Sequence, residues 1–262
     1  MKNNLIILIL TFLFFCNIAV ANSFKFETKN IEIFKEKNRI ISGKGRVFSS
    51  DNDYEINADK FEYLKDLDLL KANGNGKVTI NSKNLEIKFN KDIFDQKNST
   101  IKANGKIRIK QIGKKFLIES KEIVYYQLTD LISSNTKTIL KDDSKNIYTV
   151  DSFKFEIEKN LLKVINLEFK DRDNNTIKTK LAYINTLSGK LFGKDINVNF
   201  SNSSLNKDNE PRLKANSIIR DKNTSELTKG VFTTCKKRDG CPPWEMSAEK
   251  IQHDNSKKII NY

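Results

Sequence analysis

The side chains best suited to chemistry lie near the end of the chain, where five residues separate Cys235 from Cys241. Two cysteines so close can form a disulfide, or they can supply half of a zinc site, which needs four ligands. The sequence holds no second pair of ligands, so we expect a disulfide and leave its pairing open. The single histidine, His253, has no nucleophile near it in sequence. We therefore expect no catalytic residue, no metal and no cofactor, and hence no enzyme.

The first residues have the features of a secretory signal peptide. A positive start at Lys2 precedes an apolar run over residues 5–16, and the segment ends at Ala19-Val20-Ala21. We expect residues 1–21 to be removed on export, and an uncleaved N-terminal anchor is the alternative. An exported chain works in a compartment that permits disulfides.

Positive charge dominates, because 47 Lys and Arg stand against 33 Asp and Glu, a formal net charge of +14. Lys residues greatly outnumber Arg and are spread along the chain among Asp and Glu. Proteins that read nucleic acids usually cluster their basic side chains and use Arg for base contacts, so we expect no nucleic-acid partner. The charges fit solvated strand faces, or a field that attracts an anionic partner such as a phosphorylated glycolipid.

Alternation of apolar and polar residues is the strongest structural signal, for example over residues 85–89, 153–157 and 196–200. A period of two places the apolar side chains on one face of a β-strand. Segments rich in Gly and Asn predict turns between strands, notably residues 73–76 and 104–105. The polar stretches 128–146 and 201–211 are expected to be loops. The sequence thus predicts an all-β chain of antiparallel hairpins, which must stack because one hairpin cannot bury its own apolar face.

A degenerate repeat runs through these strands. It consists of a small or polar residue, two variable residues and then alternating apolar positions. Copies begin at Ala58, Ser120, Ala215 and Ala248, among others, at uneven steps, and a second signature is Leu70-Lys71-Ala72-Asn73-Gly74. With the export signal, this pattern resembles the OstA-like β-jellyroll of the lipopolysaccharide transport proteins.

The C-terminal segment makes the resemblance sharper. Thr234-Cys235, Trp244 and the run from Ala248 to Asp254 are similar to the junction ahead of the outer-membrane barrel in the LptD family of this group. This chain stops at Tyr262 without barrel strands, so we expect it to be the periplasmic part of such a protein, truncated or split. In that family, a cysteine at the position of Cys235 forms a disulfide to the barrel.

The resemblance implies an open, V-shaped two-sheet roll, an OstA/LptA-like antiparallel β-jellyroll built from repeated hairpins. Its expected divisions are a signal peptide at 1–21, the jellyroll at 22–229, and a Cys- and Trp-containing junction at 230–262. The implied function is to receive lipopolysaccharide from an LptA-like bridge protein and deliver it to the barrel. The implied partners are lipopolysaccharide, that bridge protein, an LptE-like lipoprotein and the barrel. The implied location is the periplasm, attached to the outer membrane.

The apolar positions of the alternating runs are candidates for a groove that holds acyl chains, with an ordinary closed core as the alternative. They are Ile56, Phe61, Tyr63, Val78, Ile80, Leu85, Ile87, Phe89, Ile107, Ile109, Ile118, Phe153, Phe155 and Ile157.

The first strand region is expected to accept a neighbouring jellyroll by strand addition, through Phe24, Phe26, Ile31 and Ile33. Two other functions stay open. One is a free-standing LptA-like bridge without a barrel, and the other is a secreted β-rich carbohydrate-active enzyme or adhesin.

Overall fold

A computed structural model of the chain describes residues 23–114, 116–143, 146–170, 174–201, 209–237, 242–254, 257 and 259–262. The described residues form 21 strands, all paired antiparallel in one hydrogen-bonded sheet. Four single-turn 3-10 helices are the only helical segments among them. The all-β antiparallel fold predicted from the alternation is therefore confirmed. Residues 1–22, with the expected signal peptide, lie outside the description.

Short strands lie at the N-terminal end, in the middle of the chain at β11 to β14, and at β21, and the others are longer. Their bounds are β1 Phe24–Thr28, β2 Ile31–Phe34, β3 Arg39–Ser42, β4 Gly45–Ser49, β5 Tyr54–Ala58, β6 Lys60–Leu64, β7 Leu69–Ile80, β8 Leu85–Asp95, β9 Thr100–Gln111, β10 Leu117–Tyr126, β11 Leu131–Ser134, β12 Thr138–Lys141, β13 Ile147–Val150, β14 Ser152–Glu156, β15 Leu161–Lys170, β16 Thr176–Asn185, β17 Leu191–Asn199, β18 Arg212–Arg220, β19 Thr224–Thr233, β20 Met246–Asp254 and β21 Ile259–Asn261. The 3-10 turns are η1 Lys35–Lys37, η2 Lys65–Leu67, η3 Asn81–Lys83 and η4 Gln127–Thr129.

The sheet is folded lengthwise into two arms, because each long strand contributes one half to each arm. Arm A comprises β1, β4, β5, β12, β13 and residues 76–80, 85–89, 107–111, 117–120, 167–170, 176–179, 196–199, 212–215, 230–233 and 246–248. Arm B comprises β2, β3, β6, β11, β14, β21 and the other halves of the same long strands. The two layers expected from the sequence are thus two arms of one sheet.

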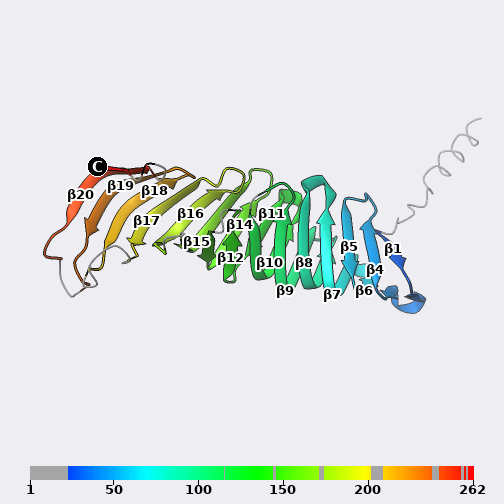
Figure 1. Cartoon of the computed structure of the whole chain (residues 1–262). Helices are drawn as coiled ribbons and strands as arrows, with labels where there is room; N and C mark the ends of the chain where they lie inside the picture. The colour runs from blue at the N-terminus through cyan, green and yellow to red at the C-terminus, as the bar shows by residue number, and fades with distance from the viewer. Residues whose placement is uncertain are drawn as a thin grey trace, which may run out of the picture.

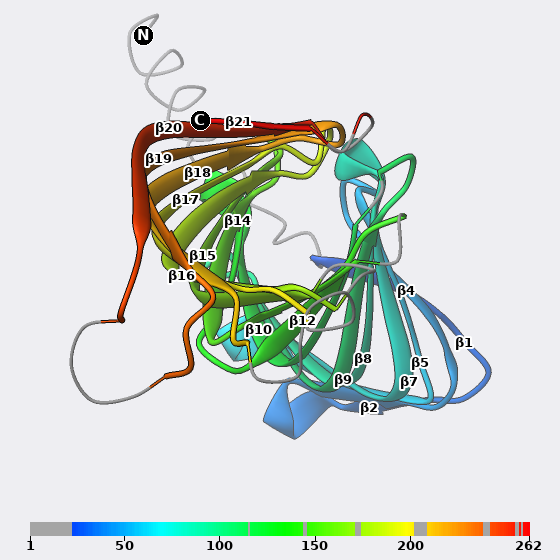
Figure 2. The same ribbon diagram turned by 60° about the vertical axis from the view of Figure 1, so that its left-hand side comes forward.

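The molecule is elongated, with strands stacked side by side from β1 at one end to β20 at the other (Figure 1). Figure 2 looks more nearly along this axis and shows the long strands bending around the interior. The sheet continues past residue 229, since β19 runs from Thr224 to Thr233 and β20 pairs with it. The expected junction at 230–262 stays a prediction.

In several strands the bend coincides with a slip of one residue in the pairing. The register shifts between Asn73 and Gly76 in β7 and between Lys88 and Lys91 in β8. Backbone in the left-handed region accompanies several bends, with φ of 78° at Gly74 and 107° at Gly105. The turns predicted at residues 73–76 and 104–105 are therefore wrong. Gly and Asn favour this conformation in bulges as well as in turns, and here they kink continuous strands.

A bulge also changes which residues face the interior. In β10, whose register shifts between Ser120 and Glu122, Ser120 and Ile123 are both buried although they lie three positions apart, and Ala215 and Ile218 show the same spacing in β18. The small residue, Ser120 or Ala215, fits the inside of the bend. The next buried side chain is three positions further on instead of two, and from there alternate side chains again point inward. The repeat seen in the sequence marks these bends.

The polar stretch 128–146 contains two strands, β11 and β12, so the loop predicted there is wrong. Each is four residues long, and each lies on a different arm beside β10. Their buried side chains include Ile132, Ser134, Thr138 and Leu140. Two of these four buried residues are polar. A search for alternating apolar residues therefore does not detect these strands.

Candidate functional site

The fourteen candidate groove residues lie together inside the fold. All belong to one continuous apolar core that extends from Phe24 to Ile251, and none is more than 3% exposed. The sequence therefore placed them correctly on the inner faces of the arms. In this structure they pack against one another as a buried core. Their role as a lipid groove stays a prediction.

The arms end in turns that form two rims, which we call lip A and lip B after the arms. Lip B is regular, because residues with left-handed backbone recur every 30 or 31 positions at Asn38, Asp68, Ser99, Asp130 and Asn160. The carbonyl of each accepts a backbone N–H from the next turn, the donors being Lys65, Gln96, Gln127, Ile157 and Thr186. This ladder joins neighbouring turns along the lip. Sequence reasoning missed it because it followed apolar residues, whereas the regular signal is an Asn, Asp or Ser.

Aromatic side chains lie inside lip B, five residues before several of these turns. The hydroxyl of Tyr63 donates to Asp68 at 2.7 Å, and that of Tyr125 donates to Asp130 at 2.8 Å. Burial raises the pKa of Tyr63 to about 12, so its hydroxyl stays a donor at neutral pH. Each bond fixes an aromatic ring against a turn of the lip.

The two lips meet in the N-terminal half of the molecule. Ser23, next to lip A, donates its hydroxyl to Asp68 of lip B at 2.8 Å. The ring of Phe24 lies 5.3 Å from that of Tyr63, and Tyr54 of lip A lies 6.2 Å from Phe94, both edge-on. Side chains make these contacts, since in the described residues β1, β4 and β5 pair only with strands of arm A.

Lys83 makes the most polar contact between the lips. It ends η3 on lip A, and its Nζ lies 2.7 Å from Asp130 Oδ2 and 2.9 Å from Glu158 Oε1 on lip B. These hydrogen bonds raise the pKa of Lys83 above its ordinary value, Asp130 first and Glu158 second. Burial acts to raise the pKa of Asp130, but the bonds from Lys83 and Tyr125 outweigh it and lower that pKa. The contact is therefore charged on both sides at neutral pH.

A second contact between the arms lies further along the molecule. The guanidinium of Arg220, at the end of β18 on lip B, lies 4.3 Å above the ring of Phe169 on arm A. That ring stacks on Tyr148 at 4.7 Å, and the Tyr148 hydroxyl donates to Asp142 on lip A. A cation over a desolvated aromatic face contributes more than an exposed one. Side chains of the two arms thus also meet in this part of the molecule.

Asp92 is the unexpected side chain of the interior. It is only 1% exposed, it faces inward from β8, and its cross-strand neighbours are Ala72 and Ala103. Oδ1 accepts the N–H of Ile93 at 2.8 Å, while Oδ2 is buried without a hydrogen-bond partner. Burial raises the pKa of this carboxyl well above its ordinary value, and the bond from Ile93 opposes that shift.

Asp92→Asn is expected to change how stability depends on pH. Below about pH 4 the carboxyl is protonated in both the folded and the unfolded chain. At higher pH the unfolded chain gives up this proton while the folded chain keeps it, so the free energy of unfolding falls as pH rises. The loss is at most about 1.4 kcal/mol per pH unit, until the buried carboxyl itself ionises. Urea unfolding from pH 4 to 8 should show this slope in the wild type relative to Asp92→Asn.

Asp95, three residues further on, is the matched control. It is on the surface, and hydrogen bonds from Asn98 lower its pKa. The Asp95→Asn variant should keep the falling slope of the wild type. Equal pH profiles for the wild type and Asp92→Asn would show that Asp92 ionises normally.

The predicted partner strand divides between the arms. Phe24 is buried and Phe26 is half-buried against Phe61, so both side chains belong to the core. Ile31 and Ile33 are exposed, the latter by 59%, on β2 at the edge of arm B. Among the described strands, β1 pairs only with β4 and β2 only with β3. Two edges, rather than one, face along the axis at this end.

The C-terminal segment packs onto the end of the sheet. The Thr233 hydroxyl donates to the carbonyl of Trp244 at 2.8 Å and accepts the N–H of Cys235 at 3.2 Å. The Trp244 ring lies 6.2 Å from that of Phe232, and Trp244 is 47% exposed. Cys235 is half-buried, and Cys241 lies outside the described residues, so the disulfide stays a prediction.

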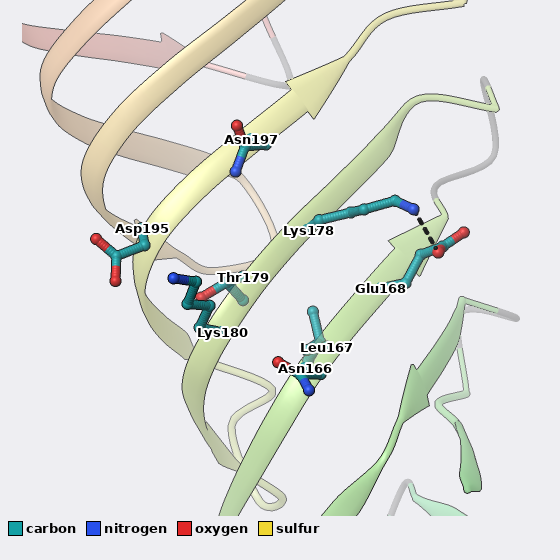
Figure 3. A pocket seen from close by; sticks show the side chains of 8 residues that line it. All are labelled: Asn166, Leu167, Glu168, Lys178, Thr179, Lys180, Asp195 and Asn197. Carbon is teal, nitrogen blue, oxygen red and sulfur yellow. Dashed lines mark ion pairs between the residues drawn. The ribbon is translucent and has the colours of Figure 1, made fainter.

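One hollow lies at the bends of β15, β16 and β17 (Figure 3). It measures about 310 Å³, and its lining is mostly polar. Lys178 reaches across one side to Glu168 at 2.9 Å, as the dashed line shows. These charges suit water rather than an acyl chain. In the described residues, no cluster of three His, Cys, Asp or Glu side chains could hold a metal ion.

No family model and no curated protein matches the sequence. Among solved structures, the chain is similar to LptH of Pseudomonas aeruginosa, described as the LptA homologous periplasmic component of the conserved lipopolysaccharide transport device. The match has 10% identity and a TM-score of 0.36, and covers 47% of this chain and 87% of that one. Because that TM-score is low, the function proposed below rests on this chain's own residues. The described part of the chain contains no helix with the length and apolarity to cross a bilayer.

Proposed function

We propose that the chain is an exported lipid-transport module whose interior accepts the acyl chains of lipopolysaccharide. One observation carries the proposal: an apolar interior runs without interruption along the molecule, between two arms whose lips meet through side chains. Burial of one methylene group contributes about 0.8 kcal/mol, so several acyl chains can replace the contacts that the arms lose on parting. Lysines at the lips would meet the lipid phosphates.

The family resemblance of the sequence suggests where the module acts. The segment around Cys235, Trp244 and His253 favours a protein of the LptD kind, in the periplasm and attached to the outer membrane. Lipopolysaccharide would arrive from an LptA-like bridge protein that adds its strands to β1 and β2. It would leave toward an outer-membrane barrel held with an LptE-like lipoprotein. Edge strands offer the backbone groups that such end-to-end joining needs.

The test places a photo-crosslinking amino acid at Ile87 or Phe61 in cells that make the protein and lipopolysaccharide. Both side chains point into the interior, while the neighbouring Lys88 is exposed on the outer face of the same strand. We expect lipopolysaccharide adducts at Ile87 and Phe61 and none at Lys88. If no interior position gives a lipid adduct, the core is a closed one and the proposal is wrong.

A further inference from the structure

The carboxyl of Asp92 lies in the compartment proposed for acyl chains, and nothing in the described fold uses its second oxygen. Oδ2 is buried without a partner, and Oδ1 accepts a hydrogen bond from the N–H of the following residue, Ile93. The direct neighbours across the strands are methyl groups, those of Ala72 and Ala103. An alanine at position 92 would complete the row with Ala72 and Ala103 and leave no polar atom unsatisfied.

Several other polar groups of the interior are satisfied, although the hydroxyl of Ser42 is also buried without a partner. Thr138 donates to Ser120 at 3.0 Å, and Ser120 lies 3.1 Å from the hydroxyl of Ser134. These hydroxyls bond to one another at the bend of the sheet. Asp92 has no such set of partners, so it carries the desolvation penalty of a buried polar group, about 1–3 kcal/mol. Buried polar groups are normally hydrogen-bonded, and an exception that lowers stability is typical of functional sites.

We infer that Asp92 is a binding residue that donates a hydrogen bond to a polar group within the acyl part of the bound lipid. An ester carbonyl, an amide carbonyl or a chain hydroxyl has the acceptor that this site lacks. The inference rests on the proposed function and adds to it the chemistry that the interior recognises. A single polar contact in an apolar compartment also sets the depth of the ligand, because every other wall contact is non-directional.

A buried carboxyl is a donor only when it is protonated, and here burial favours that form. A neutral acid bonded to a carbonyl leaves no charge inside the core. A cationic ligand would instead need the ionised carboxylate. No lysine or arginine lies opposite Asp92 on the neighbouring strands to favour that charged form. The neutral acceptor is therefore the favoured ligand group.

The test compares two probes that differ at one group, 1-monomyristoylglycerol with an ester carbonyl and 1-O-tetradecylglycerol with an ether. Their affinities for the purified full chain are measured by calorimetry below their critical micelle concentrations. A neutral hydrogen bond is worth about 0.5–1.5 kcal/mol, so the wild type should bind the ester roughly 2- to 12-fold more tightly than the ether. Asp92→Ala should bind the two alike, and Asp92→Asn, which can still donate, should keep part of the preference.

Thr138→Val is the matched control, because it removes a buried hydroxyl that already has a partner. It should keep the wild-type preference for the ester. A preference that persists undiminished in Asp92→Ala would overturn the inference while leaving the proposed function intact. If the wild type binds neither probe, the proposed function fails and the inference fails with it. Thermal unfolding of each variant shows that it is folded, and we expect Asp92→Ala to be at least as stable as the wild type.

Discussion

A covalent link across the lips is expected to reduce acyl-ligand binding at least about tenfold. The link joins Lys83→Cys on lip A to Asp130→Cys on lip B, at the place where the native side chains lie 2.7 Å apart. A short bis-thiosulfonate reagent spans the gap in a chain whose native cysteines are replaced by Ser. Packed sheets lie about 10 Å apart with side chains filling the space, so the interior admits a chain only if the arms separate. Reducing the link should restore binding.

The native contact is suited to reversible opening. An ion pair at a protein surface contributes about 0.2–1 kcal/mol, and the pairs of Lys83 are partly exposed. Other contacts between the arms include ring edges, the hydroxyl bond at Ser23 and the guanidinium of Arg220 over Phe169. A lipid that buries several methylene groups can therefore displace them.

The control link joins two positions on the same lip, Asp130→Cys and Glu158→Cys. Their turns are neighbours, since the N–H of Ile157 donates to the carbonyl of Asp130 at 3.0 Å. This link should leave binding unchanged because it does not tie the arms together. Undiminished binding by the chain linked between Lys83 and Asp130 would show that acyl ligands do not enter between the lips.

The alternation of the sequence was enough to predict the strands and the inner faces of both arms. It worked for Ile56, Val78 and Ile87 because a period of two depends only on local backbone geometry. It could not distinguish a bend from a turn at residues 73–76. Both use left-handed backbone, and the choice depends on whether the chain pairs back on itself or continues beside a distant strand.

Asp92 shows how a bend hides a site from the sequence. The side chains of Leu85, Ile87 and Phe89 point inward at every second position. If this alternation continued, it would bury Ile93 and expose Asp92. The register shift between Lys88 and Lys91 reverses the phase, so Asp92 and Phe94 face inward. The contacts of Lys83 with lip B were hidden for a different reason. They join turns 47 and 75 residues apart in the chain, and no local pattern records such a pairing.

Phe61→Ala is expected to have the largest effect on stability. It also tests whether acyl ligands bind in the interior. Phe61 is fully buried on β6, and its ring lies 6.5 Å from that of Phe26. Removal of a buried phenyl ring leaves a cavity and should lower the free energy of unfolding by about 3–5 kcal/mol. An apolar cavity accepts apolar guests, and a ligand that binds only the folded state stabilises it in proportion to its occupancy. A single-chain acyl ligand should therefore raise the melting temperature of Phe61→Ala more than that of the wild type.

The comparison for this variant is Phe48→Ala, on the outer face of β4. Phe48 is half-buried beneath Arg46, whose guanidinium lies 5.5 Å from the ring centre. Its loss should lower stability less, and the ligand should raise the melting temperature of Phe48→Ala no more than that of the wild type. Denaturant unfolding with and without ligand measures both effects. If the ligand stabilises Phe61→Ala and Phe48→Ala equally, acyl chains bind outside the core, because only an occupant of the interior can fill the space that Phe61 leaves.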